Sequence, residues 1–353
     1  MAADPETHYI WSTAEGMAMK TRILGKTGLN VSELGLGSGF MAGQGQDGVN
    51  RCVDHAIDHG VNYFDTAANY GDGRDETMLG AALKGKRDKV ILATKVGFTN
   101  RERYRLEGHR SADQLMEQFE NSLKRLQTDY VDIIQIHEAD YMKWWTDDIP
   151  ENEDAGDWGA LIEDDIDYDF SNAPAVKFLV DAKRSGKARF IGLTAKNARV
   201  LARILKVIKV DSVMTAHQFN PVFRNAVEFL FPTAQDLQVG VVIGAPLMKG
   251  WLAVPQNAWR ESPPDWMDEI FKASYFRFLD IHADADIPMA ELCIRWMLSE
   301  QKQQSIVVGF SNLQEVEFNM SAALRGVLPD DLNAAIEEVG IVHPLIYQGR
   351  TRI

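Results

Sequence analysis

Apolar runs bounded by turn residues alternate along this chain with stretches in which apolar residues recur every three or four positions. Eight runs are predicted to be strands, at residues 34–38, 61–65, 89–95, 130–137, 188–194, 212–219, 240–245 and 305–310. Helices are predicted near residues 48–59, 75–84, 111–127, 173–185, 197–208, 225–237 and 289–299, and a further helix begins at Asn312. The pattern therefore predicts an α/β protein built from repeated strand–helix units.

The number of predicted strands decides between two arrangements of such units. Eight strands with intervening helices are typical of a closed parallel (β/α)8 barrel, the TIM barrel. An open doubly wound sheet usually has fewer strands and a glycine-rich first turn, and LGLGSG near the first strand lacks the G-x-G-x-x-G fingerprint with a following acidic residue. We therefore predict the barrel, preceded by a β-hairpin over residues 21–31 that turns through residues 25–28.

Two long segments interrupt the alternation. Residues 138–172, after the fourth strand, are acidic and rich in tryptophan, and residues 246–284, after the seventh strand, carry Trp251, Trp259 and Trp266. Because barrel active sites are built from loops at the carboxyl ends of strands, both insertions are expected to overhang the site. We predict one barrel domain over residues 19–353, preceded by an N-terminal extension over residues 1–18.

Composition and charge narrow the class of protein. The 353 residues are 45% apolar, which allows a substantial core, and 37 Lys and Arg against 51 Asp and Glu give a net charge of -14. This charge argues against binding to nucleic acids or anionic membranes, both of which need a basic face. No stretch approaches the roughly 20 apolar residues of a membrane span. Residues 1–18 lack the basic start and apolar centre of a secretory signal, so we expect a cytoplasmic protein.

Cysteine and acidic residues suggest two further kinds of site, and neither is predicted. Cys52 and Cys293 fall in predicted amphipathic helices and are expected to be buried free thiols, which fits a reducing compartment. The acidic stretch EDDIDYDF lacks the glycine and distal glutamate of an EF-hand loop. His137 and Glu138 have no second histidine at ligand spacing, so no metal site is expected.

Four polar residues lie at or beyond the ends of the second, third and fourth predicted strands. Asp65 and Tyr70 lie in VNYFDTAANYG, Lys95 ends VILATK, and His137 ends VDIIQIH. In a closed barrel these side chains converge on one rim. A tyrosine can protonate a carbonyl oxygen efficiently if its pKa of about 10 is lowered, and a neighbouring ammonium lowers it. We therefore predict a nicotinamide-dependent oxidoreductase in which Tyr70 is the acid or base, Lys95 and Asp65 tune it, and His137 orients the substrate.

Each of these residues, taken alone, also has a structural interpretation. A tyrosine after a strand usually packs against its neighbours, a lysine at a strand end is usually solvated, and a lone histidine is more often structural than catalytic. Their occurrence together on three consecutive strands favours the catalytic interpretation.

At these residues the chain resembles the aldo-keto reductase superfamily. FDTAANYG followed by ETMLGAAL is similar to the family segment with the catalytic aspartate and tyrosine, ATKVG to its lysine segment, and IIQIH to its histidine segment. LGKTGLNVSELGLGSG resembles the capping hairpin and first strand of bacterial members. The resemblance covers about residues 20–319, apart from the two insertions. It implies a hairpin that caps the barrel, NADPH or NADH as cofactor, and a catalytic tetrad of Asp65, Tyr70, Lys95 and His137.

The resemblance also implies a nucleotide site on the later strands. AHQFNP is similar to the strand whose glutamine binds the carboxamide, here Gln218. IGLTA stands in place of IG-x-S-N, so Thr194 replaces the serine and Ala195 the asparagine. VIGAPLMKGWL resembles a segment that usually offers an aromatic platform to the nicotinamide, at the position of Gly244. The residues implied for the nucleotide are Thr194, Gln218, Gly244, Pro246, Leu247, Gly309, Ser311, Glu315 and Asn319.

The segment VVGFSNLQEVEFN resembles the adenosine-phosphate site and bears on the choice of nucleotide. Members of the family that prefer NADPH usually place a lysine or arginine here to pair with the 2′-phosphate. This chain has Glu315 near the expected arginine, and a carboxylate repels a phosphate but accepts hydrogen bonds from a free ribose hydroxyl. The segment therefore favours NADH. Asn319 either helps to hold the adenine or has a capping role within its own helix.

The tryptophans of the first insertion leave two interpretations open. Trp144, Trp145 and Trp158 either stack on a sugar or aromatic substrate or anchor the loop against the barrel. The acidic loop argues against an anionic substrate and suits a neutral polyol or sugar.

The leading hypothesis is an NAD(P)(H)-dependent enzyme that interconverts an alcohol with an aldehyde, ketone or sugar carbonyl. One alternative is a nucleotide-binding regulatory subunit of the same fold with little turnover, against which the four intact residues argue. Another is a hydrolase or lyase barrel, which would need a metal or paired-carboxylate site that the sequence does not clearly show.

Overall fold

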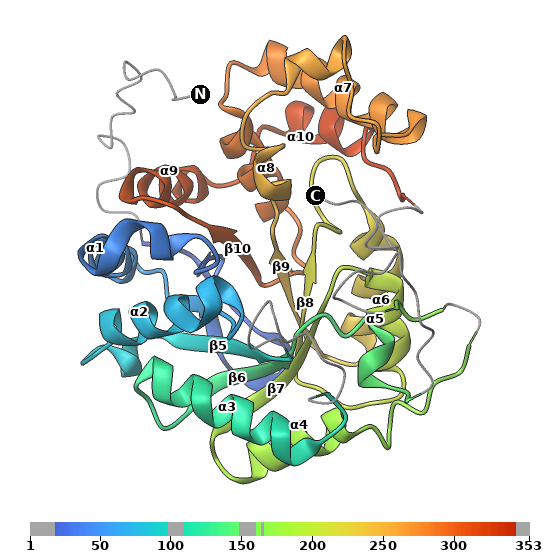
Figure 1. The fold of residues 1–353 in the computed structure, drawn as a ribbon. Coiled ribbons are helices and arrows are strands. Elements are labelled where there is room, and N and C mark those ends of the chain that lie inside the picture. Colours follow the sequence, from blue (N-terminus) through green and yellow to red (C-terminus); the bar gives the residue numbers. More distant parts are fainter. Residues whose placement is uncertain (1–17, 98–108, 148–159, 164–165, 344–353) are drawn as a thin grey trace.

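A computed structural model describes residues 18–97, 109–147, 160–163 and 166–343 of the chain. Eight parallel strands close into a barrel, because the last strand pairs with both the first and the seventh. Helices surround the strands (Figure 1), so the predicted (β/α)8 barrel is confirmed. The barrel strands are β3 (Leu34–Gly37), β4 (Tyr63–Asp65), β5 (Ile91–Val96), β6 (Val131–Ile136), β7 (Ala188–Ala195), β8 (Ser212–Ala216), β9 (Gly240–Gly244) and β10 (Ser305–Gly309).

All the predicted helices are present, with ends that differ by a few residues. Ser111, the predicted N-cap of the third helix, accepts a hydrogen bond of 3.3 Å from the backbone N–H of Gln114. The helix predicted at residues 225–237 begins as a π-helix, Ala226–Leu230, before α6. The helices are α1 (Gly45–Asp58), α2 (Arg74–Ala82), α3 (Ala112–Leu126), α4 (Pro174–Arg184), α5 (Ala198–Leu205), α6 (Phe231–Asp236), α7 (Glu269–Ala285), α8 (Met289–Leu298), α9 (Leu313–Leu324) and α10 (Asp330–Glu337).

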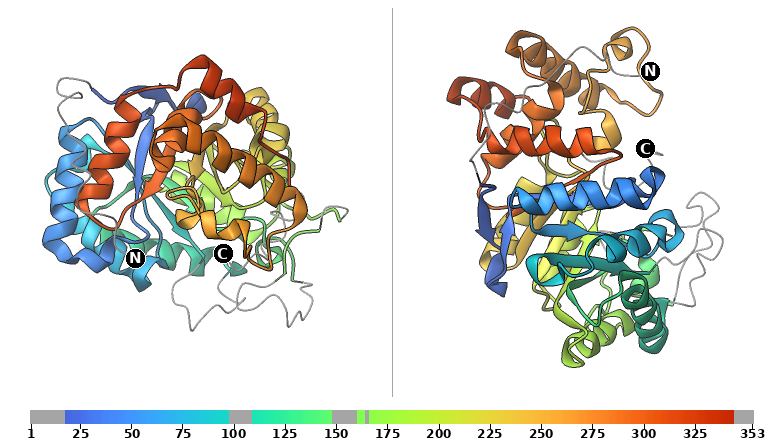
Figure 2. Two further views of the ribbon diagram at one scale, coloured as in Figure 1. Left: turned by 90° about the horizontal axis from the view of Figure 1, so that it is seen from above. Right: turned by 90° about the vertical axis from the view of Figure 1, so that its left-hand side faces the viewer.

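The predicted hairpin closes one end of the barrel (Figure 2). Its strands β1 (Thr21–Ile23) and β2 (Asn30–Ser32) pair antiparallel, and Leu24 between them is fully buried. Leu24 lies against Gly240 at the start of β9, where any side chain on the glycine would meet it. Leu24 also belongs to one apolar cluster with inward-facing strand residues such as Tyr63 and Ile133. The hairpin therefore seals the amino-terminal end of the barrel, which leaves the carboxyl-terminal rim for a site.

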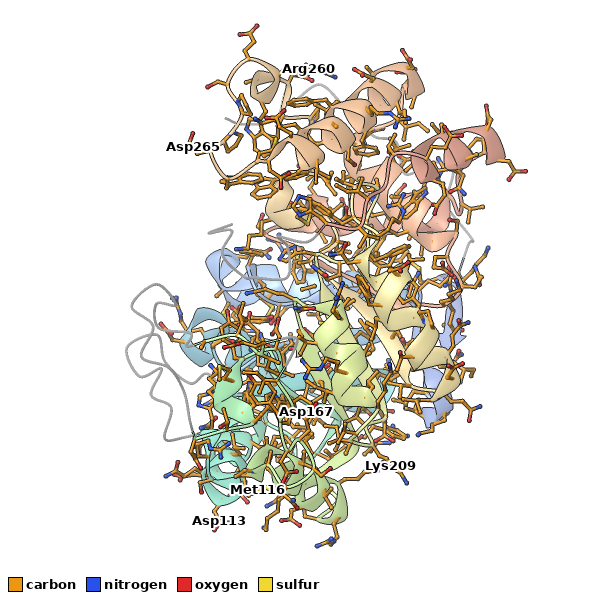
Figure 3. All side chains as sticks on the ribbon, turned by 90° about the vertical axis from the view of Figure 1, so that its right-hand side faces the viewer. Asp113, Met116, Asp167, Lys209, Arg260 and Asp265 are labelled. Atoms are coloured by element: carbon orange, nitrogen blue, oxygen red, sulfur yellow. The ribbon has the colours of Figure 1, made fainter. Side chains whose placement is uncertain are left out.

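The second insertion is more ordered than the sequence predicted. It ends in α7, which was not expected, and Asp268 caps this helix by accepting from the backbone N–H of Phe271 at 2.9 Å. Before the helix, the rings of Trp251 and Trp266 stack with centroids 4.4 Å apart, and Trp259 meets Trp266 edge-on at 5.7 Å. The insertion forms one end of the molecule, with Arg260 and Asp265 labelled far from Asp113 and Met116 of α3 (Figure 3).

Other sequence expectations concern cysteines, metals and membranes. Cys52 and Cys293 are buried free thiols, as predicted. Among the residues that the structure describes, no group of three or more His, Cys, Asp or Glu side chains could hold a metal ion. Within the same part of the chain, no helix combines the length and apolar character needed to cross a membrane. Trp158 and nearly all of the predicted N-terminal extension lie outside the described residues.

Candidate active site

Three neighbouring strands bring polar side chains to the inside of the barrel rim. Asp65 is the last residue of β4, Lys95 the last but one of β5, and His137 directly follows β6. Lys95 lies beside Gln135 in the register between β5 and β6. Because side chains alternate along a strand, Gln135 and His137 point to the same face of β6. Local strand geometry alone therefore gathers these groups at one place.

A buried ion pair forms the centre of the site. The ammonium of Lys95 donates to Oδ1 of Asp65 and, at 2.9 Å, to the carbonyl oxygen of Thr66. Gln135 Nε2 donates to the other carboxylate oxygen of Asp65 at 3.1 Å. Lys95 and Asp65 are 2% and 3% exposed. Both charges are thus paired and hydrogen-bonded, which is the condition for burying them without a large penalty.

Tyr70 reaches this pair from the loop after β4. It begins a 3-10 turn in which Gly71, Asp72 and Gly73 have φ angles of 55°, 56° and 83°. Two of these left-handed positions are glycines, which adopt them without strain. The Lys95 ammonium donates to the hydroxyl of Tyr70 at 3.4 Å. The tight turn therefore aims the phenol back at the ion pair.

His137 completes the group on the other side of Tyr70. The two rings meet edge to face, with centroids 5.8 Å apart and an angle of 82° between their planes. The backbone N–H of His137 donates to the carbonyl of Val96 at 3.1 Å, which fixes its position next to β5. The structure thus brings together all four side chains that the sequence singled out.

The protonation states of the site differ in part from those expected. Burial raises the pKa of Tyr70, and the lowering effect of the Lys95 ammonium does not outweigh it. The expected fall in the Tyr70 pKa is therefore wrong for the protein alone, although Lys95 acts in the predicted direction. Burial lowers the pKa of Lys95, but Asp65 and Tyr70 favour the charged form more strongly and raise it overall. Tyr70 is thus a neutral phenol beside an ammonium at physiological pH.

The imidazole of His137 is neutral at physiological pH. Burial, followed by the positive charges of Lys95, Lys196 and Lys143, lowers its pKa well below the usual value. A neutral imidazole has one N–H group, which can donate a hydrogen bond to a carbonyl oxygen.

Sequence reasoning missed a second ion pair beside His137. Glu138 has a φ of 56°, unusual for a residue with a side chain, and its backbone N–H donates to Thr194 Oγ1 at 3.0 Å. Its carboxylate pairs with Lys196, directly after β7, at 2.6 Å. Gln135 was missed as well. Its spacing of two residues from His137 on one strand could have revealed it.

Two tryptophans of the first insertion, Trp144 and Trp145, anchor the loop. Trp144 is fully buried, donates to the carbonyl of Glu138 at 3.1 Å and meets the ring of His109 at 4.5 Å. Trp145 is 4% exposed, donates to the carbonyl of Ala139 at 2.7 Å and meets Phe170 at 5.0 Å. Neither indole has a free face for a substrate. Of the two roles left open by the sequence, the structure therefore favours anchoring.

The residues implied for the nicotinamide lie at or just after the carboxyl ends of β7, β8 and β9. Thr194 is near the end of β7, and its hydroxyl oxygen already accepts from Glu138 but can still donate. Gln218 follows β8 and is fully buried, and its Nε2 has no hydrogen-bond partner among the residues that the structure describes. Gly244 ends β9, and a Cβ there would lie 3.0 Å from the sulfur of Met214. Pro246 and Leu247 follow in the turn after β9.

The residues implied for the adenosine side lie at the end of β10 and on α9. Gly309 ends β10 and is exposed. Glu315 accepts from the backbone N–H of Ser311 at 2.7 Å and from its hydroxyl at 2.8 Å. Asn312 caps α9 through the backbone N–H of Glu315 at 2.9 Å. Asn319 is 5% exposed, and its side chain makes no hydrogen bond to any residue that the structure describes.

Comparison with known proteins agrees with this geometry. The model of the Aldo/keto reductase family matches residues 33–341. The chain is 29% identical over 319 residues to the uncharacterized oxidoreductase YqkF of Bacillus subtilis, covering 86% of this chain and 91% of that protein. It is 29% identical over 317 residues to the L-galactose dehydrogenase of Arabidopsis thaliana, covering 86% of this chain and 88% of that protein.

A solved structure shows the same likeness in three dimensions. The aldo-keto reductase AKR11C1 from Bacillus halodurans, in its holo form, is 26% identical with a TM-score of 0.71. The alignment covers 94% of this chain and all of that one, 100%. With a family model that matches most of its length and a barrel of the same architecture, the chain belongs to the aldo/keto reductase family.

Proposed function

We propose that this protein interconverts a carbonyl and an alcohol using a nicotinamide nucleotide, with Tyr70 as the general acid and base. The observation that carries the proposal is the contact of 3.4 Å between the Tyr70 hydroxyl and the Lys95 ammonium, which is itself paired with Asp65. Its relatives include an L-galactose dehydrogenase and a pyridoxal 4-dehydrogenase, so sugars and aldehydes are the substrates to test first. The buried thiols of Cys52 and Cys293 support action in a reducing compartment such as the cytoplasm.

Each residue of the site has a separate part in this chemistry. In reduction, the Tyr70 hydroxyl gives its proton to the oxygen of the substrate, and the Lys95 ammonium stabilises the phenolate that remains. Asp65 holds Lys95 charged and in place. The neutral imidazole of His137 donates a hydrogen bond to the same oxygen and so orients the carbonyl. In oxidation, the phenolate of Tyr70 removes the proton from the alcohol.

The residues on the later strands fit a nicotinamide nucleotide. Gln218 offers a buried amide nitrogen that no described residue satisfies, and such a group costs free energy unless a ligand satisfies it. Thr194 can still donate from its hydroxyl, and the amide of Asn319 on α9 makes no hydrogen bond to any residue that the structure describes. Gln218 and Thr194 would hold the carboxamide, and Asn319 the adenine. When bound, the nucleotide supplies or accepts the hydride.

The start of α9 supports a preference for NADH. A helix N-terminus attracts phosphate because its first backbone N–H groups point outward and its dipole favours negative charge. Here the carboxylate of Glu315 already accepts from the N–H of Ser311 and from the amide of Asn312. A 2′-phosphate would have to displace this carboxylate and would be repelled by it, whereas a ribose hydroxyl could donate to it.

Replacement of Tyr70 by phenylalanine tests the proposal. The variant should lose about 10²- to 10⁴-fold in kcat, because it lacks the proton that the hydroxyl transfers. Turnover is followed by nicotinamide absorbance with NADH and NADPH on a panel of aldehydes, ketones, sugars and alcohols. Calorimetric titration with the same nucleotides shows that binding survives the substitution. If the variant turns over as fast as the wild type on the best substrate, Tyr70 is not the acid.

A further inference from the structure

The amide of Gln218 is held in one orientation by a chain of hydrogen bonds that begins near the carboxyl end of the protein. Residues 341–343 run beside the segment after β8. The N–H of Ile341 donates to Val222 at 2.8 Å, and the N–H of Arg224 donates to Ile341 at 2.7 Å. Two backbone hydrogen bonds at Ile341 therefore fix the start of residues 341–343, which we call the strap.

The strap sets the orientation of Asn225. The backbone N–H of His343 donates to Asn225 Oδ1 at 2.8 Å, and Asn225 Nδ2 donates back to the carbonyl of His343 at 3.1 Å. A backbone N–H can only donate and a carbonyl can only accept, so the amide of Asn225 cannot be turned over without losing both bonds. Asn225 is fully buried, which makes such a loss costly.

Asn225 in turn sets the orientation of Gln218. Its remaining Nδ2 hydrogen is donated to Gln218 Oε1 at 3.2 Å, and the backbone N–H of Ala198 faces the same oxygen at 3.5 Å. Two donors therefore hold the oxygen of Gln218 on the protein side. The amide nitrogen is left as a buried donor with no partner in the part of the chain that the structure describes.

We propose that Asn225 is a positioning residue which turns the NH2 group of Gln218 toward the nucleotide, so that the strap at residues 341–343 contributes to nucleotide affinity. The inference rests on the proposed function, in which Gln218 contacts the carboxamide. The group that Gln218 recognises is then a hydrogen-bond acceptor, such as the oxygen of a carboxamide. The His343 ring also meets Asp268, the cap of α7, at 3.0 Å. The strap thereby links the second insertion to the same amide.

A double-mutant cycle tests this coupling, with NADH binding measured by calorimetry on the full chain. In Asn225→Asp the new carboxylate cannot donate to Gln218, so the amide should turn its NH2 group inward and present its oxygen. We expect NADH to bind about tenfold more weakly, the value of one buried hydrogen bond. When Asn225→Asp is added to the Gln218→Ala variant, it should change NADH affinity by less than about twofold. Asn121→Asp on α3 makes the same chemical change as a control.

The outcomes separate this inference from the function on which it rests. If Gln218→Ala binds NADH as tightly as the wild type, Gln218 is not a nucleotide contact. The role of Gln218 in the proposed function and its positioning by Asn225 are then both wrong. If Gln218→Ala weakens binding but Asn225→Asp does not, or if Asn225→Asp weakens it equally in both backgrounds, the coupling alone is wrong.

A second variant guards against a failure of Asn225→Asp to fold. Gln218→Glu keeps an acceptor for Asn225 and for the N–H of Ala198, but presents an oxygen instead of a donor. It should weaken NADH at least about tenfold while the strap stays intact. Affinity equal to that of the wild type in this variant would overturn the proposed orientation.

Discussion

The two halves of the barrel rim treat their polar groups in opposite ways. At the ends of β4, β5 and β6 the charged groups pair with one another, with Lys95 bonded to Asp65 and Asp65 to Gln135. Beyond β8 and on α9, the uncharged amides of Gln218 and Asn319 keep hydrogen-bonding groups that no described residue uses. A paired network is organised before any ligand arrives. Donors and acceptors without a partner, by contrast, form their hydrogen bonds only when a ligand binds. We therefore expect substitutions in the first half to change stability and chemistry, and those in the second half to change nucleotide affinity.

Lys95→Met should have the largest effect, because it breaks the paired half at its centre. The Asp65 carboxylate would remain buried without its cation, which typically costs about 3–5 kcal/mol of unfolding free energy. The pKa of Tyr70 should rise further, since Lys95 is the group that opposes the effect of burial. Urea unfolding and kcat/KM measure the two losses. The double variant Asp65→Leu with Lys95→Met is the control: stability should recover, because no lone charge is left, and activity should not. Recovery of both would show that the pair is structural only.

The pH dependence of the reaction should reveal which form of Tyr70 is used. Because burial raises its pKa, the neutral phenol persists through neutral pH, and reduction should be flat there and fall only at alkaline pH. Oxidation needs the phenolate, so its rate should rise by about tenfold per pH unit below that pKa. The lowered pKa of His137 predicts no inflection near its usual value. Profiles of kcat/KM in both directions, from about pH 6 to about pH 10, measure this. A flat oxidation profile would contradict the role of Tyr70.

The sequence predicted that Asp65, Lys95 and His137 converge, although it missed Gln135 and the Glu138–Lys196 pair, and the reason for the success is geometric. Strands alternate their side chains with a period of two, and the carboxyl ends of parallel barrel strands lie on one rim, so inward-facing polar residues at these ends meet there. The positions of Asp65, Lys95 and His137 on their strands were enough to predict that these side chains meet. The direction of the Tyr70 pKa shift was wrong, because it depends on how deeply the phenol is buried, which local pattern does not give.

The features that the sequence did not predict depend on packing between distant parts of the chain. The sequence left open whether Trp144 contacts a substrate or anchors the loop, and its complete burial in the fold favours anchoring. Asn225 could not be recognised, because its partner His343 lies 118 positions away. The helix α7 did carry a signal, with Asp268 as cap and Phe271, Tyr275 and Phe278 on one buried face. Only one long connection is predicted over residues 246–284, and this helix is therefore missed.

Gln135→Met sharpens the comparison inside the paired half. It removes the hydrogen bond of 3.1 Å to Asp65 and replaces the amide with an apolar side chain of similar size. Lys95 and Asp65 remain paired but lose part of their orientation, so kcat should fall by about tenfold with little change in KM. Thr94→Val is a matched control on β5: it breaks the bond of 2.6 Å from Thr94 to Glu76 on the neighbouring α2, away from the ion pair. Equal loss of kcat in both variants would mean that general loosening of the strands, and not Gln135, is responsible.

Glu315→Gln should have the smallest effect, and it tests the nucleotide half. A glutamine can still accept from the N–H of Ser311, and Asn312 still caps α9, while the negative charge is removed. Because the side chain is exposed, the repulsion of a 2′-phosphate is screened by water and salt. The ratio of NADPH to NADH affinity should therefore rise by only about three- to tenfold, and less at high salt. Calorimetric titration with both nucleotides measures the ratio, with Glu338→Gln beyond α10 as the control for charge. A ratio that stays constant at low salt would show that the Glu315 carboxylate does not face the ribose, and the preference for NADH would lose its physical basis.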